Sequence, residues 1–206
     1  MARQRIPIFP LNYLILPGEK KFLHIFEERY KELLKDCLST GSEFGVAVWL
    51  KNNKKILNPP RVISEFGVSV KIVRILKTTE RGETDLIVEG QNVFRLHDFE
   101  SVARPKLYGS AEAEFISQTH LSENDELINA CNKFLKHLKK KPLKKNENKI
   151  SIFQMAEVLQ MESEEKIRLL QSDHLTAREN ILLNKARLEN KILEAEEKLE
   201  GDFWLN

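Results

Sequence analysis

The spacing of apolar residues changes once along the chain, and this change restricts the folds that the chain can adopt. Before residue 120, apolar residues form short runs or alternate with polar ones, as at Val68, Val70 and Ile72. Alternation is typical of a strand with one buried face. After residue 120 the spacings become three and four, the period of an amphipathic helix. The sequence therefore predicts a β-rich domain over residues 1–118 and an α-helical subdomain over residues 119–206.

The β-rich domain is predicted to contain several short, closely spaced strands. We expect them at residues 44–49, 68–76, 86–88, 93–96 and 107–116. The alternation slips by one place between Ile72 and Ile75, which indicates a bulge or a strong bend. Short strands at this spacing favour a small barrel or sandwich.

One helix is predicted inside this β-rich domain, over residues 26–39. Its apolar face comprises Phe26, Tyr30, Leu33, Leu34, Cys37 and Leu38. Acidic residues at its start suit the helix dipole, and Gly41 suits a left-handed cap at its end. Replacing Leu33 or Leu34 is therefore expected to create a cavity in the core.

The C-terminal subdomain is predicted to be a helical bundle. Helices are expected at residues 122–140, 152–159, 163–170 and 176–199. The last helix has one apolar stripe, made by Ile181, Leu188, Ile192, Ala195 and Leu199. We expect this stripe to pack against the preceding helices. The alternative is a second subunit or a bound protein, because the segment 203–205 (Phe-Trp-Leu) extends the apolar surface.

Composition excludes several classes of protein. The 206 residues include no apolar run of eighteen, so no transmembrane helix is expected. Prolines at positions 7, 10 and 17 interrupt the apolar N-terminus, which therefore does not resemble a signal peptide. Two cysteines, Cys37 and Cys131, cannot form a disulfide framework. We expect a cytoplasmic protein without a membrane contact.

Motifs for catalysis and cofactor binding are absent from the sequence. It contains no GxxxxGK[ST] phosphate loop, no GxGxxG, no HExxH and no GxSxG. The five histidines are scattered, and adjacent acidic pairs such as Glu27 and Glu28 point in different directions on a helix. We therefore expect no catalytic residues, no metal site and no cofactor, and we do not expect an enzyme.

The most specific pattern lies in the first 46 residues. It comprises the segments 6–11 (Ile-Pro-Ile-Phe-Pro-Leu), 16–18 (Leu-Pro-Gly), 23–27 (Leu-His-Ile-Phe-Glu), 29–30 (Arg-Tyr) and 44–46 (Phe-Gly-Val). Pro17-Gly18 can form a type II turn. This set, in this order, resembles the N-terminal, substrate-binding domain family of the ATP-dependent Lon proteases. The resemblance is strong up to about residue 116. It departs from the family at Glu28, where proline is frequent, and at Phe94-Arg95, where the basic and aromatic residues are exchanged.

The resemblance implies an α+β fold: a PUA-like small β-barrel with one inserted helix, followed by a C-terminal helical bundle. It also implies a stand-alone member of the family that lacks the ATPase and peptidase modules. Such a chain would be a non-catalytic module that binds unfolded proteins, partner proteins or peptides. A separate ATP-dependent protease is one candidate partner. We expect a monomer or a weak homodimer. The family's motif supplies four candidate binding residues, Tyr13, Phe22, His24 and Tyr30, whereas Phe9, Leu11 and Phe26 are expected in the core.

Nucleic-acid binding is the alternative function. RNA-binding domains also use the PUA-like fold, and residues 133–149 contain eight lysines, which could neutralise phosphates. However, residues 151–206 carry twelve acidic against seven basic residues, and few aromatic side chains lie among the lysines. The sequence therefore favours a protein-binding module over a nucleic-acid-binding one.

Overall fold

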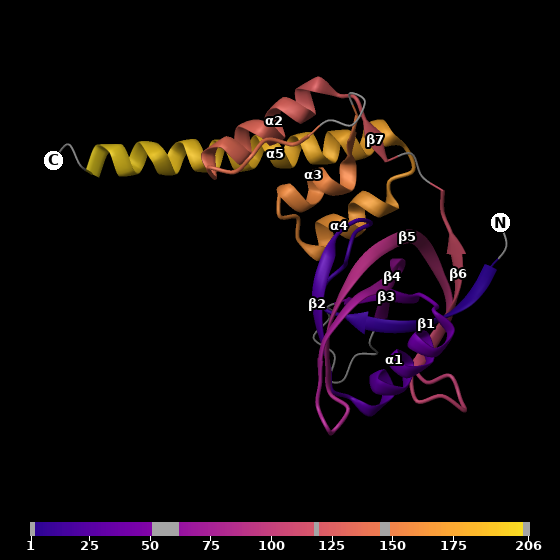
Figure 1. Ribbon diagram of the computed structural model, residues 1–206. Coiled ribbons are helices and arrows are strands. Elements are labelled where there is room, and N and C mark those ends of the chain that lie inside the picture. Colours follow the sequence, from indigo (N-terminus) through magenta and orange to yellow (C-terminus); the bar gives the residue numbers. More distant parts are fainter. Residues whose placement is uncertain (1–2, 51–61, 118–119, 145–148, 204–206) are drawn as a thin grey trace, which may run out of the picture. The chain divides into compact units, whose positions relative to one another are not determined.

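The computed structural model describes residues 3–50, 62–117, 120–144 and 149–203 (Figure 1). It divides into two compact units. The first holds the described residues up to 117 together with Glu162–Leu170, and the second holds the other described residues. The sequence assigned all residues after 118 to a helical subdomain, whereas the structure groups most of α4 (Ser163–Gln171) with the strands. The cause is a polar contact, because the Lys166 side chain of α4 is buried against Glu19.

The first unit contains one six-stranded sheet. Its strands are β1 (Arg3–Leu11), β2 (Lys20–Ile25), β3 (Phe44–Leu50), β4 (Val62–Thr78), β5 (Thr84–Glu100) and β6 (Gly109–Phe115). Their order is β2-β5-β4-β3-β1-β6, and β5 also pairs with β6. The β1–β3 pair is parallel and the other pairs are antiparallel. Because β5 pairs with β6, the sheet closes into a barrel-like ring, to which β2 adds as an outer strand. This arrangement confirms the predicted α+β class.

The larger core cluster of this unit lies between the sheet and α1 (Glu28–Thr40), which follows β2 directly, and a smaller cluster around Ile8 and Phe94 is formed by strand residues alone. The buried face of α1 comprises Tyr30, Leu33, Leu34 and Cys37. The Tyr30 ring meets the ring of Phe9 edge-on, with 4.1 Å between the centroids. The helix therefore closes the core with the apolar face that its spacing predicted, except at two positions. Leu38 is exposed, and Phe26 lies before the helix and is also exposed, so the expectation that Phe26 is a core residue was wrong.

Two local predictions are confirmed in the strands and turns. Leu16 O accepts a hydrogen bond from Glu19 N at 3.0 Å, and Gly18 between them has φ +82°. Proline followed by a residue of positive φ is the type II turn expected at Pro17-Gly18. The β4–β5 pairing also shifts its register between Ile72 and Arg74, where the apolar alternation slips. This bulge bends β4 as it follows the ring.

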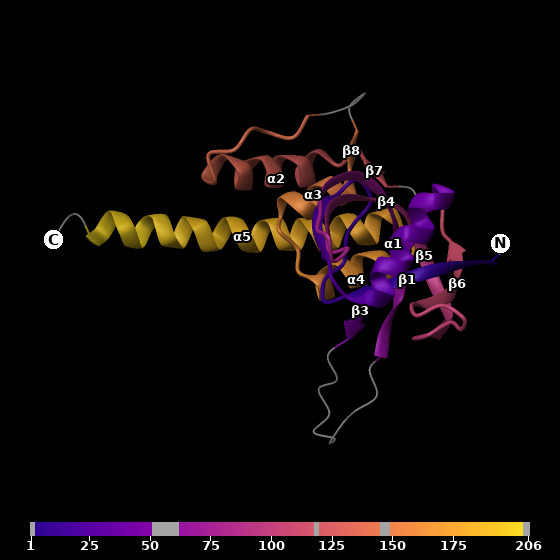
Figure 2. The same cartoon turned by 60° about the horizontal axis from the view of Figure 1, so that its bottom comes forward.

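The second unit is mainly helical (Figure 2). It contains α2 (Asp125–His137), α3 (Ile152–Val158) and α5 (Leu175–Phe203), with the short pair β7 (Leu121–Ser122) and β8 (Ile150–Ser151). The side-chain oxygen of Asn124 caps α2 by accepting from Leu127 N, and α2 lies along α5. Among the described residues, no helix is both long and apolar enough to cross a membrane.

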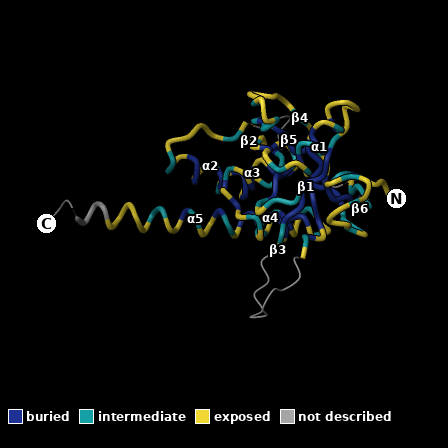
Figure 3. Tube along the Cα trace, turned by 90° about the horizontal axis from the view of Figure 1, so that it is seen from below, coloured by how far each residue is buried: buried dark blue, intermediate teal, exposed yellow. Residues whose placement is uncertain are grey.

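The buried face of α5 differs from the predicted stripe. The buried residues are Arg178, Leu182, Leu183, Ala186 and Asn190, whereas Leu188, Ile192, Ala195 and Leu199 are exposed (Figure 3). The sequence analysis chose the longer apolar stripe, but the face that packs against α2 includes Asn190. The side-chain NH2 group of Asn190 donates to Ala130 O and to Ala186 O. The side chains of residues 203–205 lie outside the described part of the chain.

The buried face of α1 can be tested by truncating two leucines of the same helix. Leu33 is 2% exposed and Leu38 is 47% exposed. We expect Leu33→Ala to lower the free energy of unfolding by about 2–5 kcal/mol, because it removes buried methyl groups and leaves a cavity. The control Leu38→Ala should change it by less than about 0.5 kcal/mol. Urea denaturation followed by circular dichroism measures both, and equal losses would show that the helix face is misassigned.

Candidate functional site

Three side chains with rings are exposed along β2 and at the residue that follows it. Phe22 is 55% exposed and Phe26 is 57% exposed, and His24 between them is also exposed. Leu23 and Ile25 alternate with them and are buried in the core. The His24 and Phe26 rings stack with 5.7 Å between centroids, and His24 Nδ1 lies 2.6 Å from Asp85 Oδ1. Strand alternation and these two contacts therefore hold three rings on the outer side of the sheet.

The neighbouring strands extend this surface, which we call the β2 face and define as Phe22, His24, Phe26, Asp85 and Ile87. Phe22 is paired with Ile87 of β5, and His24 with Asp85. Directly opposite residues of an antiparallel pair project on the same side of a sheet. The β2 face is therefore apolar at Phe22, Phe26 and Ile87, with one carboxylate at Asp85.

Basic residues of β4 border the β2 face. Arg74 is paired with Ile87, and Lys77 with Asp85, so both basic residues lie on the strand next to the β2 face. Both are exposed. A segment that binds the β2 face would meet apolar rings first and positive charges at the border, which suits an apolar segment flanked by acidic residues.

The loop before β2 is fixed by a buried carboxylate. Glu19 Oε2 accepts from Leu16 N at 2.9 Å and from Lys166 Nζ at 2.9 Å, and both Glu19 and Lys166 are buried. Lys166 Nζ also donates to Leu14 O at 3.1 Å, and Lys21 Nζ lies 2.9 Å from Glu19 Oε1. Burial by itself would raise the pKa of Glu19, but the Leu16 amide, Lys166 and Lys21 outweigh it, so the pKa lies below the ordinary value. Glu19 is therefore an anion at neutral pH and anchors the start of β2 to α4.

A close backbone contact fixes the other side of this loop. Gly18 N donates to Gly90 O at 2.9 Å, and Gly90 N donates to Glu19 O at 3.0 Å. A Cβ atom at position 90 would lie 2.1 Å from Leu16 O, which is too close for any side chain. Glycine is thus required at position 90 so that the loop can cross β5.

The four predicted binding residues do not form one cluster. Phe22 and His24 share the β2 face. Tyr13 is partly buried against the core, and burial raises its pKa above the ordinary value despite the nearby Lys21. Tyr30 is buried against Phe9, so its ring is not available to a ligand. Of the residues expected in the core, Phe9 is buried and Leu11 is partly buried.

The sequence analysis missed Phe26 and Ile87 as members of this surface. Phe26 was assigned to the helix because it lies four residues before Tyr30. The spacing of two from Phe22 through His24 to Phe26 was the signal that could have placed it on the strand face. Ile87 carries no such signal, because its exposure follows from the pairing of β5 with β2.

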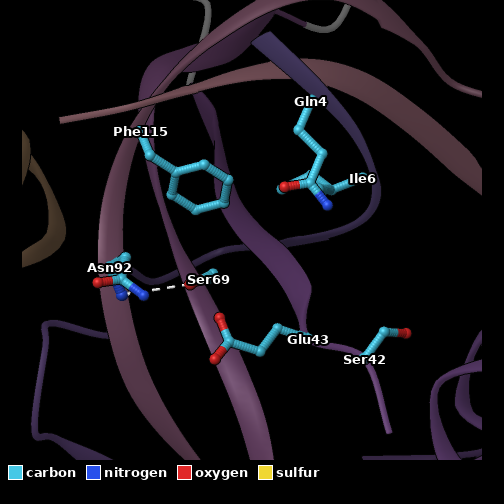
Figure 4. Close-up of a pocket in the computed structure, with 7 residues that line it drawn as sticks. All are labelled: Gln4, Ile6, Ser42, Glu43, Ser69, Asn92 and Phe115. Atoms are coloured by element: carbon cyan, nitrogen blue, oxygen red, sulfur yellow. Dashed lines mark hydrogen bonds between the residues drawn. The ribbon is translucent and has the colours of Figure 1, made fainter. Parts of the chain in front are cut away.

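A concavity opens among the strands of the first unit, apart from the β2 face (Figure 4). It has a volume of about 510 Å³ and is lined by Gln4, Ile6, Ser42, Glu43, Ser69, Asn92 and Phe115. Ser69 Oγ accepts a hydrogen bond from the backbone amide of Asn92 at 3.2 Å. The lining includes one carboxylate and two serine hydroxyls, and neither a histidine nor a lysine.

The described residues also contain no group of three or more His, Cys, Asp or Glu that could hold a metal ion. Cys37 and Cys131 are buried, free thiols. Burial raises the pKa of Cys37, and it raises the pKa of Cys131 to about 12. Both are therefore protonated at neutral pH and are poor nucleophiles.

The lysine-rich segment offers fewer free charges than the sequence suggests. Lys133 Nζ lies 2.5 Å from a carboxylate oxygen of Glu194, and Lys149 Nζ lies 2.7 Å from one of Glu123. Residues 145–148 lie outside the described part of the chain. The acidic partners reduce the positive charge that this segment would present to phosphates.

Comparisons with known proteins match residues of both units. The family model for the ATP-dependent protease La (LON) substrate-binding domain matches residues 5–184 of this sequence. A LON peptidase N-terminal domain and RING finger protein of Schizosaccharomyces pombe is 29% identical over 104 residues, which cover 46% of this chain and 21% of that protein. The chain thus spans about a fifth of the length of this curated relative.

Two solved structures share the fold. A Lon N-terminal domain protein of Xanthomonas campestris is 26% identical, with a TM-score of 0.65, and the alignment covers 88% of this chain and 98% of that one. The N-terminal domain of a Mycobacterium avium complex Lon protease gives a TM-score of 0.55 at 14% identity, over 89% of this chain and 98% of that one. The second likeness concerns the fold alone.

The buried ion pair before β2 predicts both a stability loss and its pH dependence. Glu19→Gln leaves Lys166 without its buried counter-charge, so we expect the free energy of unfolding to fall by about 3–5 kcal/mol at neutral pH. Because the pKa of Glu19 is lowered in the folded state, its contribution is present above the ordinary value of 4.5 and is lost as the pH falls through the folded value. Denaturation at pH 7 and at successively lower pH should therefore show the two proteins converging below about pH 4.5. A difference that stays constant over this range would contradict the role given to Glu19.

Proposed function

Because the chain belongs to the LON substrate-binding domain family, we propose that it binds exposed apolar segments of unfolded or partner proteins through the β2 face. The observation that carries this proposal is the exposure of two phenylalanines, Phe22 and Phe26, on one strand face. Exposed aromatic residues on one face of a strand are a typical sign of a protein-binding surface.

The fixed geometry of these rings supports the proposal. His24 stacks on Phe26 and is held by Asp85, and the start of β2 is anchored through Glu19. A surface whose side chains are already ordered loses less conformational entropy when a ligand binds. The β2 face can therefore bind an apolar segment without reorganising the strands beneath it.

The position of β2 in the sheet gives the ligand main-chain partners as well. Among the described strands, β2 pairs with β5 and with no other strand. The outer edge of such a strand carries backbone N–H and C=O groups that can pair with an extended segment. Main-chain pairing tolerates many sequences, whereas the two phenylalanines select for apolar side chains.

We propose binding without catalysis, in the cytoplasm. The two thiols are buried and protonated, and the concavity among the strands has neither a histidine nor a lysine beside its serines, so we assign an activated nucleophile to neither place. Free cysteines are compatible with a reducing compartment.

The proposal is tested by removing the two phenylalanines. The ligand is a fluorescein-labelled extended peptide rich in Leu and Phe with flanking acidic residues, and binding is measured by fluorescence anisotropy. Each ring buried on binding contributes on the order of 1.5 kcal/mol or more. We therefore expect the double variant Phe22→Ser/Phe26→Ser, which removes both rings, to raise Kd at least about a hundredfold.

Two variants and one altered peptide serve as controls. Leu38→Ser and Leu107→Ser each replace an exposed apolar residue away from the β2 face, at 47% and 54% exposure, and should leave Kd unchanged. A peptide with every Leu and Phe replaced by Ser should not bind. An unchanged Kd in the double variant, with an unchanged melting temperature, would overturn the proposal.

A further inference from the structure

The C-terminal half of α5 carries an apolar stripe whose described residues are exposed. Leu188 is 55% exposed, Ile192 43% and Leu199 70%, and Ala195 on the same stripe is also exposed (Figure 3). Such a stripe on a solvated helix is unfavourable in water. Its residues recur at spacings of four, three and four, the spacing of a coiled-coil seam.

The stripe lies opposite the face of α5 that α2 already covers. The covered face is identified by Asn190, whose side chain donates to Ala130 O at 2.9 Å, and by Glu194, which pairs with Lys133. At about 100° per residue, Leu188 and Ile192 lie about 160° around the helix from Asn190. A second helix can therefore approach the stripe without displacing α2.

We propose that this stripe is the seam of a parallel two-stranded coiled coil with a second copy of this chain. In heptad terms Ile192 and Leu199 take the a positions, and Leu188 and Ala195 take the d positions. Ile192 at a and Leu188 at d are the combination that favours two parallel strands. Lys185 takes the preceding a position and pairs with Glu189 at 2.9 Å, so a charged residue ends the apolar seam and fixes its register.

The charges beside the seam determine both the partner and its direction. Lys191 and Lys198 take the g positions on one flank, and Glu189 and Glu196 take the e positions on the other. In a parallel pair each g residue faces the e residue of the next heptad, so Lys191 faces Glu196 of the second copy. An antiparallel pair would place lysine against lysine and glutamate against glutamate. Neither Lys191 nor Glu196 has an ion pair among the described residues, so both are available.

The proposal is tested by sedimentation velocity of the full chain over a range of concentrations. The wild-type chain should pass from monomer to dimer as the concentration rises. Ile192→Asp should remain a monomer throughout, because it places two uncompensated carboxylates opposite each other in the seam. The matched control Leu38→Asp replaces a similarly exposed leucine in α1 and should dimerise as the wild type does. A wild-type chain that stays monomeric at its highest soluble concentration overturns the proposal.

A charge exchange tests the direction of the pair. Lys191→Glu and Glu196→Lys each place like charges across the seam, and each should weaken dimerisation by about threefold to tenfold. The double variant Lys191→Glu/Glu196→Lys restores opposite charges and should restore the wild-type dissociation constant. A double variant as weak as the single ones would overturn the parallel seam, and helicity measured by circular dichroism verifies that each variant is folded.

Discussion

A carboxylate buried among apolar residues has to be neutralised by its surroundings, and Glu19 imposes this requirement on the first unit. Its two carboxylate oxygens accept hydrogen bonds from Lys166 and from the Leu16 amide, and Lys21 forms an ion pair with one of them. Lys166 comes from a helix almost 150 positions later in the chain. The charge thereby joins α4, the loop at residues 14–19 and the first residues of β2. An apolar contact in the same place would be less directional, because hydrogen bonds to a charged group fix both distance and angle.

The exposed rings of β2 follow from this anchoring. The loop crosses β5 at Gly90, where only a glycine leaves room for Leu16 O. After the crossing, β2 pairs with β5 from Lys20 to Ile25, and this register turns Leu23 and Ile25 inward and Phe22 and His24 outward. A shift of one residue would bury the rings and expose the core residues. The β2 face therefore depends on the register that Glu19 and Gly90 set.

Much of the fold was predictable from local signals in the sequence. Period-two alternation, the slip near Val73 and the Pro17-Gly18 turn identified strands, a bulge and a turn, because each depends on neighbouring residues alone. The family motif also includes Phe22 and His24, which the structure places exposed on β2. The predictions that failed concern residues whose surroundings are set by contacts distant in the sequence. Lys166 looks like any lysine on a solvated helix until Glu19 is placed beside it. Asn190 gives the buried face of α5 a polar appearance, although its NH2 group donates to Ala130 O and Ala186 O in the folded chain. Tyr30 failed as a binding residue because α1 turns its ring toward Phe9.

The central claim is that apolar segments bind on the β2 face. A titration of the isotope-labelled full chain with the Leu- and Phe-rich peptide, followed by amide chemical shifts, tests it residue by residue. The account predicts that the largest shifts fall on residues 20–26 and on Asp85 and Ile87, with little change at Gln4, Glu43 and Asn92 around the concavity. Shifts concentrated around that concavity, with β2 unchanged, would contradict it.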